Sequence, residues 1–347
     1  MQTIQVSGSH YRYEISINEG LIDDLAREIL CHISLKRALV VSDERVWSLY
    51  GPAITRSFAA AQLESSALIL KTGGYAATLD ALKEISAAME GLTLGPEDGL
   101  VVIGGGTLCD TGGFAAWHHK DVVRLIQVPT TMIGMTDWAV EGKSALEYRP
   151  GSKMIGSFFP PSLVLIDPRC ALSLNERVFD AGMGEVIKCA CAADAPLFRL
   201  LESLDGRTAL QQRLEEITWR CLYVKRALIQ KDARLTMLGH GIAHAVEATQ
   251  RYRILLHGEA VAVGMYCVTR RGEALGYTQK GTAERLEACL NRYHLPTSTL
   301  VDSESMLRAI QALGECVTPV PQRIGFCEAL TVSNAFLVNA WFGGIAY

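Results

Sequence analysis

Three histidines stand close together in the segment 239–265, which reads GHGIAHAVEATQRYRILLHGEAVAVGM. His240 and His244 are four residues apart and therefore project from one face of a helix. His257 follows a loop rich in arginine and tyrosine and stands where another helix is expected to begin. Histidines four residues apart can bind zinc, although such pairs are more often structural. The spacing alone leaves open which of these histidines bind a metal.

A carboxylate that could complete such a site lies well upstream. Glu185 and Lys188 are three residues apart in FDAGMGEVIKCA, so they share a helical face. Pairs at this spacing are commonly solvated, but the small and apolar neighbours of this pair indicate a buried face. A buried carboxylate needs a partner, and a metal ion is one such partner. Two histidines and one carboxylate leave a coordination position open, which is typical of catalytic zinc sites.

Three consecutive glycines, Gly104, Gly105 and Gly106, come directly after an apolar run and before a helical pattern. Glycines at such a turn let the backbone approach a pyrophosphate, whose charge the amide groups of the following helix stabilise. The spacing differs from the common GxGxxG, and turns of purely structural purpose also contain three glycines. We expect a phosphate-binding turn, with a structural turn as the alternative.

The segment after the next predicted strand carries polar groups that could serve the same ligand. It reads QVPTTMIGMTDWAVEGKSAL and supplies two hydroxyls (Thr130 and Thr131), a carboxylate (Asp137) and an ammonium group (Lys143). Such a segment could be a polar connection and nothing more. Because it follows a strand beside the glycine turn, we favour a role in ligand binding.

The elements that position these groups follow two patterns. In the first half, apolar runs alternate with helical patterns, which predicts a parallel sheet covered on both faces, as in a Rossmann-like α/β domain. From about Leu172 the periodicity is helical, with no convincing strand until the final stretch. We therefore expect an α/β domain over residues 1–171 and an α-helical domain over residues 172–347. The predicted strands are 37–43, 66–74, 99–106 and 122–131, and the helices between them include 78–90 and 110–119.

The composition argues against several other classes of protein. The 347 residues are 49% hydrophobic and 20% charged, with a formal net charge of −4, which offers no broad cationic surface for nucleic acid or anionic lipid. No apolar run approaches the length of a membrane span, and the N-terminal stretch lacks the layout of a signal peptide. The ten cysteines are scattered without a CxxC pair, so we expect buried thiols in a cytoplasmic protein.

Six segments of the chain resemble, in order and approximate spacing, the motifs of the 3-dehydroquinate synthases of the sugar-phosphate cyclase superfamily. They are VVIGGGTLCDTGGFAA, IQVPTTMIGMTDWAVEGKSAL, KMIGSFFPPSLVLID, AGMGEVIKCA, LGHGIAHAVE and LHGEAVAVGM. The resemblance is strong over residues 101–265 and weak in the flanks. It implies an NAD-binding α/β domain, an α-helical domain for metal and substrate, and assembly into a homodimer.

The resemblance also implies roles for individual residues. Glu185, His240 and His257 correspond to the metal ligands, with Zn²⁺ as the expected ion and Co²⁺ as an alternative. His244 is then a residue of the substrate side. The other positions that contact the substrate in the family correspond to Asp137, Lys143, Lys188 and Lys225. The positions of the NAD site correspond to Asp43, Gly104, Gly105, Gly106, Asp110, Thr130 and Thr131.

The reaction implied by the resemblance converts a sugar phosphate into a carbocycle. Bound NAD⁺ oxidises a substrate hydroxyl to a ketone, which acidifies the adjacent C–H bond, and phosphate is then eliminated. The ketone is reduced back, and an intramolecular aldol reaction closes the ring. The metal polarises the hydroxyl and the carbonyl that it becomes, and NAD is regenerated in each turnover.

Several cationic positions of the substrate pocket depart from the family pattern. Asp121 stands where the family has an arginine for the substrate phosphate, although Lys120 is adjacent. The segment 225–240 is several residues shorter than its counterpart and lacks a carboxylate-binding arginine, and Met237 replaces an asparagine. The late DKK motif, whose lysine meets the phosphate, has no counterpart in residues 305–326.

Further departures lie in residues 147–153 of the predicted first domain and at the cofactor site. Glu147 and Lys153 stand at asparagine positions, and Ser152 stands at a lysine position. The stretch GGYAAT at residues 73–78 lacks a glutamate and a lysine of the adenosine end. Each charge-assisted contact contributes about 1.5–3 kcal/mol, so several losses weaken the binding of a phosphorylated sugar acid. We therefore expect a substrate other than the usual heptulosonate.

Three alternatives stay open at this point. The first is an authentic but divergent 3-dehydroquinate synthase whose lost pocket residues are compensated elsewhere. The second is a metal-dependent alcohol dehydrogenase, against which HGEAVAVGM and AGMGEVIK argue. The third is a non-catalytic paralogue that keeps the metal for structure, which the altered adenosine motif favours.

Overall fold

The computed structural model describes residues 2–146, 155–314 and 316–343. The chain divides into two compact units, Met1–Ser173 and Leu174–Tyr347. The assignment of NAD to the first domain and of metal to the second stays a prediction. The departures at Glu147, Ser152 and Lys153 lie outside the described residues.

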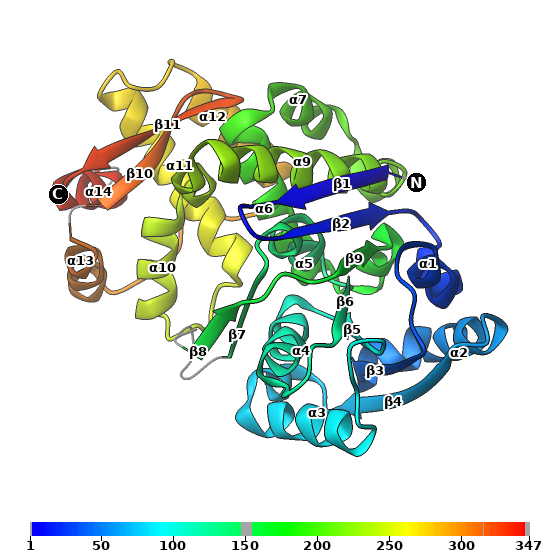
Figure 1. The fold of residues 1–347 in the computed structure, drawn as a ribbon. Helices are drawn as coiled ribbons and strands as arrows, with labels where there is room; N and C mark the ends of the chain where they lie inside the picture. Colours follow the sequence, from blue (N-terminus) through cyan, green and yellow to red (C-terminus); the bar gives the residue numbers. More distant parts are fainter. Residues whose placement is uncertain (1, 147–154, 315, 344–347) are drawn as a thin grey trace. The chain divides into compact units, whose positions relative to one another are not determined.

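A seven-stranded sheet forms the centre of the first unit (Figure 1). Its strand order is β1-β2-β9-β6-β5-β3-β4, and all neighbouring strands are parallel except β1 and β2. The predicted α/β class with a parallel sheet is thus confirmed, with an antiparallel edge strand at the N-terminus. The strands are β1 (Gln2–Ser7), β2 (Arg12–Ile17), β3 (Arg37–Asp43), β4 (Glu64–Leu70), β5 (Gly99–Gly104), β6 (Arg124–Pro129) and β9 (Leu163–Ile166).

Helices pack on this sheet through its alternating apolar side chains. Leu39 and Val41 of β3 and Leu100 and Val102 of β5 join one buried cluster with residues of α3 and α4, because every second side chain points to the same face. Helix α2 also contacts β3 and β4. The helices are α1 (Leu25–His32), α2 (Glu44–Ala60), α3 (Leu79–Gly91), α4 (Gly106–His118) and α5 (Met132–Thr136), and a small sheet pairs β7 (Lys143–Leu146) with β8 (Ile155–Phe158).

Strand β5 ends and helix α4 begins earlier than the sequence predicted. The expected strand reached Gly106 and the expected helix began at Asp110, but the strand ends at Gly104 and α4 begins at Gly106. The Gly105 carbonyl already accepts bonds from the N–H groups of Leu108 and Cys109, which is how a helix starts. Asp110 is therefore a residue of α4 and not its first one.

The order of the strands creates a switch point beside the glycine turn. From β3 the chain passes to β4 on one side and then returns to β5 on the other side of β3. In open α/β sheets, ligands bind at such points, outside the carboxyl ends of the strands. Gly104 pairs in register with Pro129, and Ser42 pairs with Ile103. The turns after β3, β5 and β6 therefore lie at one edge of the sheet.

The second unit is mainly helical, with one hairpin near its end (Figure 1). Both features confirm the sequence prediction for this part of the chain. Its helices are α6 (Glu176–Ala193), α7 (Ala195–Ser203), α8 (Gly206–Gln211), α9 (Leu214–Asp232), α10 (His240–Thr249), α11 (His257–Ala274), α12 (Thr282–Arg292), α13 (Ser303–Ala312) and α14 (Asn334–Phe342), and the hairpin pairs β10 (Cys316–Arg323) with β11 (Phe326–Val332).

Two general expectations concern membranes and thiols. Among the described residues, none of the helices combines the length and the apolar character that crossing a membrane requires. All ten cysteines are free thiols, and most of them are buried as predicted, whereas Cys31 is exposed.

Candidate functional site

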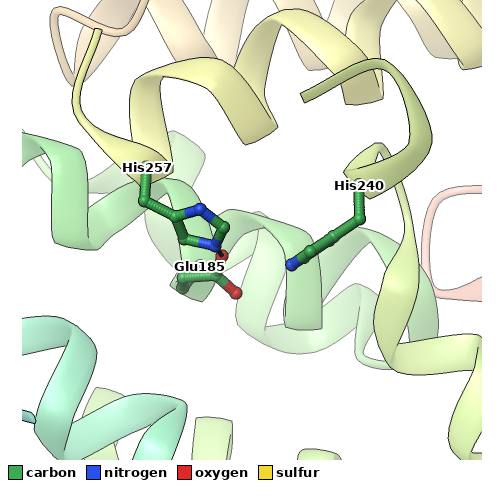
Figure 2. A group of neighbouring side chains, drawn as sticks. All are labelled: Glu185, His240 and His257. Carbon is green, nitrogen blue, oxygen red and sulfur yellow. Dashed lines mark ion pairs between the residues drawn. The ribbon is translucent and has the colours of Figure 1, made fainter. Parts of the chain in front are cut away.

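Three helices of the second unit bring a carboxylate and two imidazoles together (Figure 2). Glu185 lies in the middle of α6, His240 is the first residue of α10, and His257 is the first residue of α11. One ligand atom from each side chain lies within 4.8 Å of the others. Figure 2 shows the Glu185 carboxylate and the two imidazoles directed toward the same space. We call these three residues the triad.

Close contacts between glycines allow the three helices to approach. A Cβ atom on Gly258 would lie 1.7 Å from the Ala181 carbonyl oxygen, and one on Gly184 would lie 2.4 Å from the Gly258 oxygen. A Cβ on Gly264 would lie 2.1 Å from the oxygen of Gly239, which itself has φ +81°. Backbone therefore packs on backbone between α6 and α11, and between α11 and the start of α10. Gly184, Gly258 and Gly239 each adjoin a triad residue in the sequence.

The environment of Glu185 suits a cation. Glu185 is 0% exposed, and neither carboxylate oxygen accepts a regular hydrogen bond from the described residues. The ammonium group of Lys188 forms an ion pair with Oε2 of Glu185. Burial alone would raise the pKa of Glu185, but Lys188 and the nearby His257 and His240 lower it well below its usual value. The carboxylate is therefore ionised and short of donors, which fits a metal ligand.

The two imidazoles of the triad differ electrostatically. Burial and the neighbouring Lys188 ammonium lower the pKa of His240 well below its usual value, so this ring is neutral. Burial also favours the neutral form of His257, but the close Glu185 carboxylate and the hydrogen bond to Glu247 outweigh burial and raise the pKa of His257 to about 10. His257 Nε2 lies 3.4 Å from Glu185 Oε1. Without a metal, a proton on His257 thus balances the charge of the carboxylates.

His244 lies beside the triad without belonging to it. Its ring centroid is 5.4 Å from that of His240 and 6.3 Å from that of His257. The side chain is exposed, and it is not one of the three groups that lie within ligand distance of one another. This placement supports the prediction that His244 faces substrate, which stays a prediction.

Two buried lysines accompany this region of the second unit. Lys188 is 2% exposed on α6 and Lys225 is 1% exposed on α9, and these two helices contact each other. A buried ammonium group requires compensation, which Glu185 provides for Lys188. The sequence had predicted that the face of Glu185 and Lys188 is buried, and the structure confirms it.

In the first unit, the glycine turn packs against the segment after β6. The Thr130 N–H donates to the Gly104 carbonyl at 2.8 Å, and a Cβ on Gly105 would lie 3.2 Å from Thr131 Cγ2. A Cβ on Gly106 would have the Trp138 ring as its nearest neighbour, at 3.7 Å. The turn opens directly into α4, whose first N–H groups can bind an anion. The structure thus brings Gly104, Gly105, Gly106, Thr130 and Thr131 together.

The carboxylates predicted for the NAD site have structural partners. Asp110 is 3% exposed and accepts a hydrogen bond of 2.8 Å from the Trp138 indole N–H. Asp43 caps α2 by accepting from the Arg45 and Val46 N–H groups at 2.9 and 3.0 Å. If Asp110 and Asp43 also bind a cofactor, they do so in addition to these structural hydrogen bonds.

Two residues of the first unit, Asp137 and Lys143, were predicted to contact the substrate. Asp137 follows α5 at its C-terminal end. Lys143 is the first residue of β7, has a side chain that is 70% exposed, and lies 3.9 Å from Glu141 Oε2. An exposed ammonium group of this kind is available to an anionic ligand.

Two residues near these groups were absent from the sequence prediction. Glu247 accepts a hydrogen bond from His257 Nδ1 at 2.9 Å. Its position seven residues after His240, on the same helical face, was a signal that could have been used. Trp138 donates to Asp110 and is the side chain nearest to a Cβ built on Gly106, and no spacing rule identifies it.

Comparisons with known proteins place the chain among cyclases of one fold. A family model described as "3-dehydroquinate synthase N-terminal" matches residues 67–181, and one described as "3-dehydroquinate synthase C-terminal" matches residues 182–313. A 3-dehydroquinate synthase from Clostridium beijerinckii is 32% identical over 311 residues, which cover 88% of this chain and 89% of the relative.

Two solved structures share the fold at lower sequence identity. One is ValA, a 2-epi-5-epi-valiolone synthase from Streptomyces hygroscopicus with NAD⁺ and Zn²⁺ bound, with a TM-score of 0.86, 24% identity and coverage of 97% of this chain and 98% of that one. The other is a 2-deoxy-scyllo-inosose synthase complexed with carbaglucose-6-phosphate, NAD⁺ and Co²⁺. Its TM-score is 0.85 at 19% identity, with coverage of 98% of this chain and 99% of that one.

Proposed function

Because this chain belongs to the 3-dehydroquinate synthase family of carbon–oxygen lyases, we propose that it is an NAD- and metal-dependent sugar-phosphate cyclase. It would oxidise a substrate hydroxyl transiently, eliminate phosphate, return the hydride and close a carbocycle. The observation that carries the proposal is the triad, which gathers a buried carboxylate and two imidazoles within 4.8 Å.

The residues of the triad would hold a divalent cation such as Zn²⁺ or Co²⁺. A cation bound there polarises a hydroxyl or carbonyl oxygen. Glu185 supplies an ionised carboxylate, and the neutral ring of His240 supplies a nitrogen lone pair. Lys188 compensates the charge of Glu185 from the protein side. His244 is exposed next to the triad, where it could move a proton to or from a substrate.

The glycine turn of the first unit would hold NAD. This cofactor accepts and returns a hydride, while the protein supplies binding and orientation. Support comes from the position of the turn at the switch point, from the α4 N-terminus and from the absence of a close contact at Gly106, where a Cβ would be 3.7 Å from its nearest neighbour. We assign Thr130 and Thr131 to the same site because they lie against the turn.

We propose a sugar phosphate other than the usual heptulosonate as the substrate. The lost cationic donors support this choice, since each charge-assisted contact contributes about 1.5–3 kcal/mol to the binding of an anion. The losses concern both the carboxylate and the phosphate ends. The cations that remain at predicted substrate positions are Lys143, Lys188 and Lys225, and Lys120 stands beside Asp121. Two proteins of this fold are named for products other than dehydroquinate.

The test is a panel of sugar phosphates, with heptulosonate phosphate among them, offered to the enzyme with NAD⁺ and Zn²⁺. We expect phosphate release and a carbocyclic product without net NADH. Steady turnover of heptulosonate phosphate would instead identify an authentic 3-dehydroquinate synthase, and accumulating NADH would identify an alcohol dehydrogenase. A chain that neither binds NAD nor releases phosphate would be a non-catalytic paralogue.

Variants of the histidines and of Glu185 test the assignment of the triad. Glu185→Gln and His257→Ala each remove a proposed ligand. They should lower metal affinity by more than the roughly 10- to 100-fold that is typical when a residue hydrogen-bonded to a ligand is replaced. His244→Ala should keep the metal and lose turnover, because its ring is not one of the grouped ligands. Metal content and phosphate release measured side by side decide the matter. Equal loss of metal in all three variants would contradict the assignment.

A further inference from the structure

Helix α10 carries a carboxylate, Glu247, on the same face as its two histidines. His240, His244 and Glu247 are spaced by four and three residues, so their side chains line one stripe of the helix. Glu247 is only 6% exposed. A buried carboxylate is costly unless it is hydrogen-bonded, so its partner identifies what it does in the fold.

The partner of Glu247 is the second nitrogen of a triad histidine. Glu247 Oε1 lies 2.9 Å from His257 Nδ1. Because a carboxylate accepts, the proton of the ring is held at Nδ1. Once the second ring proton is lost, the lone pair is on the opposite nitrogen, Nε2, which is the atom that lies 3.4 Å from Glu185 Oε1. The hydrogen bond thus selects the tautomer and fixes the plane of the ring.

The backbone of His257 is held by separate contacts. Glu259 accepts the Leu256 N–H at 2.7 Å and receives a two-pronged hydrogen bond from Arg177, with both distances at 2.7 Å. These bonds fix the first turn of α11 without involving Glu247. Glu247 therefore acts on the ring of His257 and not on its main chain.

The other imidazole of the triad has a weaker acceptor. His240 Nδ1 lies 3.4 Å from the Leu238 carbonyl oxygen, a neutral acceptor at a longer distance. A carboxylate raises the basicity of a ligating imidazole more than a carbonyl does, and such outer partners typically contribute 10- to 100-fold in metal affinity. The ring of His257 is thus held by a stronger hydrogen bond than the ring of His240.

We propose that Glu247 is a positioning residue for the metal site, which holds His257 in the tautomer and orientation that present Nε2 to a divalent cation. The inference rests on the proposed function only in that the triad binds metal. It assigns to Glu247 a share of metal affinity that is separate from folding.

The experiment uses the full chain, freed of metal and titrated with Zn²⁺ against a chromophoric chelator. Glu247→Gln keeps the size of the side chain and removes its charge, and it should bind Zn²⁺ about 10- to 100-fold more weakly than the wild type. With Co²⁺, its visible absorption spectrum should differ from that of the wild type, because a ligand nitrogen has changed its donor strength. The matched control is Glu273→Gln, since Glu273 lies on the same α11 as His257 and its carboxylate accepts the Ala283 N–H at 2.7 Å, away from the triad.

The outcomes separate the inference from its premise. If the wild type binds Zn²⁺ and Glu247→Gln binds it within about twofold, with an unchanged Co²⁺ spectrum, the positioning role is wrong while the proposed function stands. If the wild type itself binds no Zn²⁺, the proposed function fails first. If Glu247→Gln does not fold, as judged by circular dichroism, Glu247→Asp takes its place. Its shorter carboxylate should still weaken Zn²⁺ binding, and full wild-type affinity in that variant would overturn the inference.

Discussion

Gly258, next to the triad, and Gly106, in the glycine turn, have opposite surroundings. A Cβ on Gly258 would meet the Ala181 carbonyl oxygen at 1.7 Å, whereas a Cβ on Gly106 would have its nearest neighbour at 3.7 Å, an ordinary contact. In the second unit the missing side chain is replaced by the backbone of another helix. In the first unit the nearest side chain, Trp138, leaves room for a methyl group at Gly106.

The difference shows two ways of building a site. The turn is contiguous in the sequence, and the donors that it would offer to a ligand are backbone N–H groups at the start of α4. The triad combines side chains from three helices, so its geometry depends on how closely those helices pack. A substitution that separates the helices should therefore damage the triad, whereas a methyl group in the turn should damage binding alone.

The largest effect is expected for Gly258→Ala. The new methyl group would overlap backbone of α6, which cannot rotate away as a side chain can, so α6 and α11 must move apart. Overpacking of this kind costs about 3 kcal/mol of unfolding free energy. Because Glu185 and His257 lie on these two helices, Zn²⁺ affinity should fall as well. Denaturant titration and a Zn²⁺ titration measure the two losses.

Gly241→Ala is the matched control for this variant. Gly241 follows His240 in α10, and a Cβ there would lie 3.5 Å from its nearest neighbour, Leu337. Alanine favours helix over glycine by roughly 0.5–1 kcal/mol, so this variant should be as stable as the wild type or slightly more stable. If Gly258→Ala were equally tolerated, the close helix contact would not hold the triad together.

Much of the fold could be predicted from the sequence because it rests on local periodicity. Strand β3 coincides with the predicted strand at 37–43, since an apolar run between turn residues has few alternative structures. The start of α4 was misplaced because three glycines carry no apolar periodicity. The antiparallel pairing of β1 depends on contacts with β2, which alternation alone does not specify.

The candidate site was predictable to a different extent. Burial of Glu185 and Lys188 followed from their small and apolar neighbours. The choice among the histidines did not follow from spacing and needed the family resemblance, because the carboxylate of the triad is distant in the sequence. The spacing of Glu247 from His240 was a usable signal, but its bond to His257 and the bond of Trp138 to Asp110 depend on tertiary packing that the sequence does not show.

A smaller effect, confined to binding, is expected for Gly106→Ala. The fold has room for the methyl group, so the free energy of unfolding should stay the same or rise by about 0.5 kcal/mol. If a pyrophosphate lies against this backbone, NAD⁺ should bind about tenfold more weakly, the equivalent of about 1.4 kcal/mol. Calorimetric titration with NAD⁺ measures the change.

Gly91→Ala serves as its control in the same unit. Gly91 is the last residue of α3, and a Cβ there would meet no atom within 4 Å. Both variants should unfold like the wild type, and only Gly106→Ala should lose NAD⁺ affinity. Unchanged affinity in Gly106→Ala would mean that the cofactor does not lie against the backbone of this turn.

The smallest effect is expected for Trp138→Phe, which tests what bounds the space at Gly106. Phenylalanine keeps an aromatic ring beside the turn but removes the indole N–H that donates to Asp110 at 2.8 Å. The loss should cost about 1 kcal/mol of unfolding free energy, the net contribution of one hydrogen bond, because Asp110 has further interactions.

Trp117→Phe, on the exposed side of α4 with a side chain 48% exposed, is the control and should change stability by less than about 0.5 kcal/mol. Equal denaturation midpoints for the two variants would show that the Trp138–Asp110 bond does not stabilise the wall of the turn, and that packing alone keeps this space open.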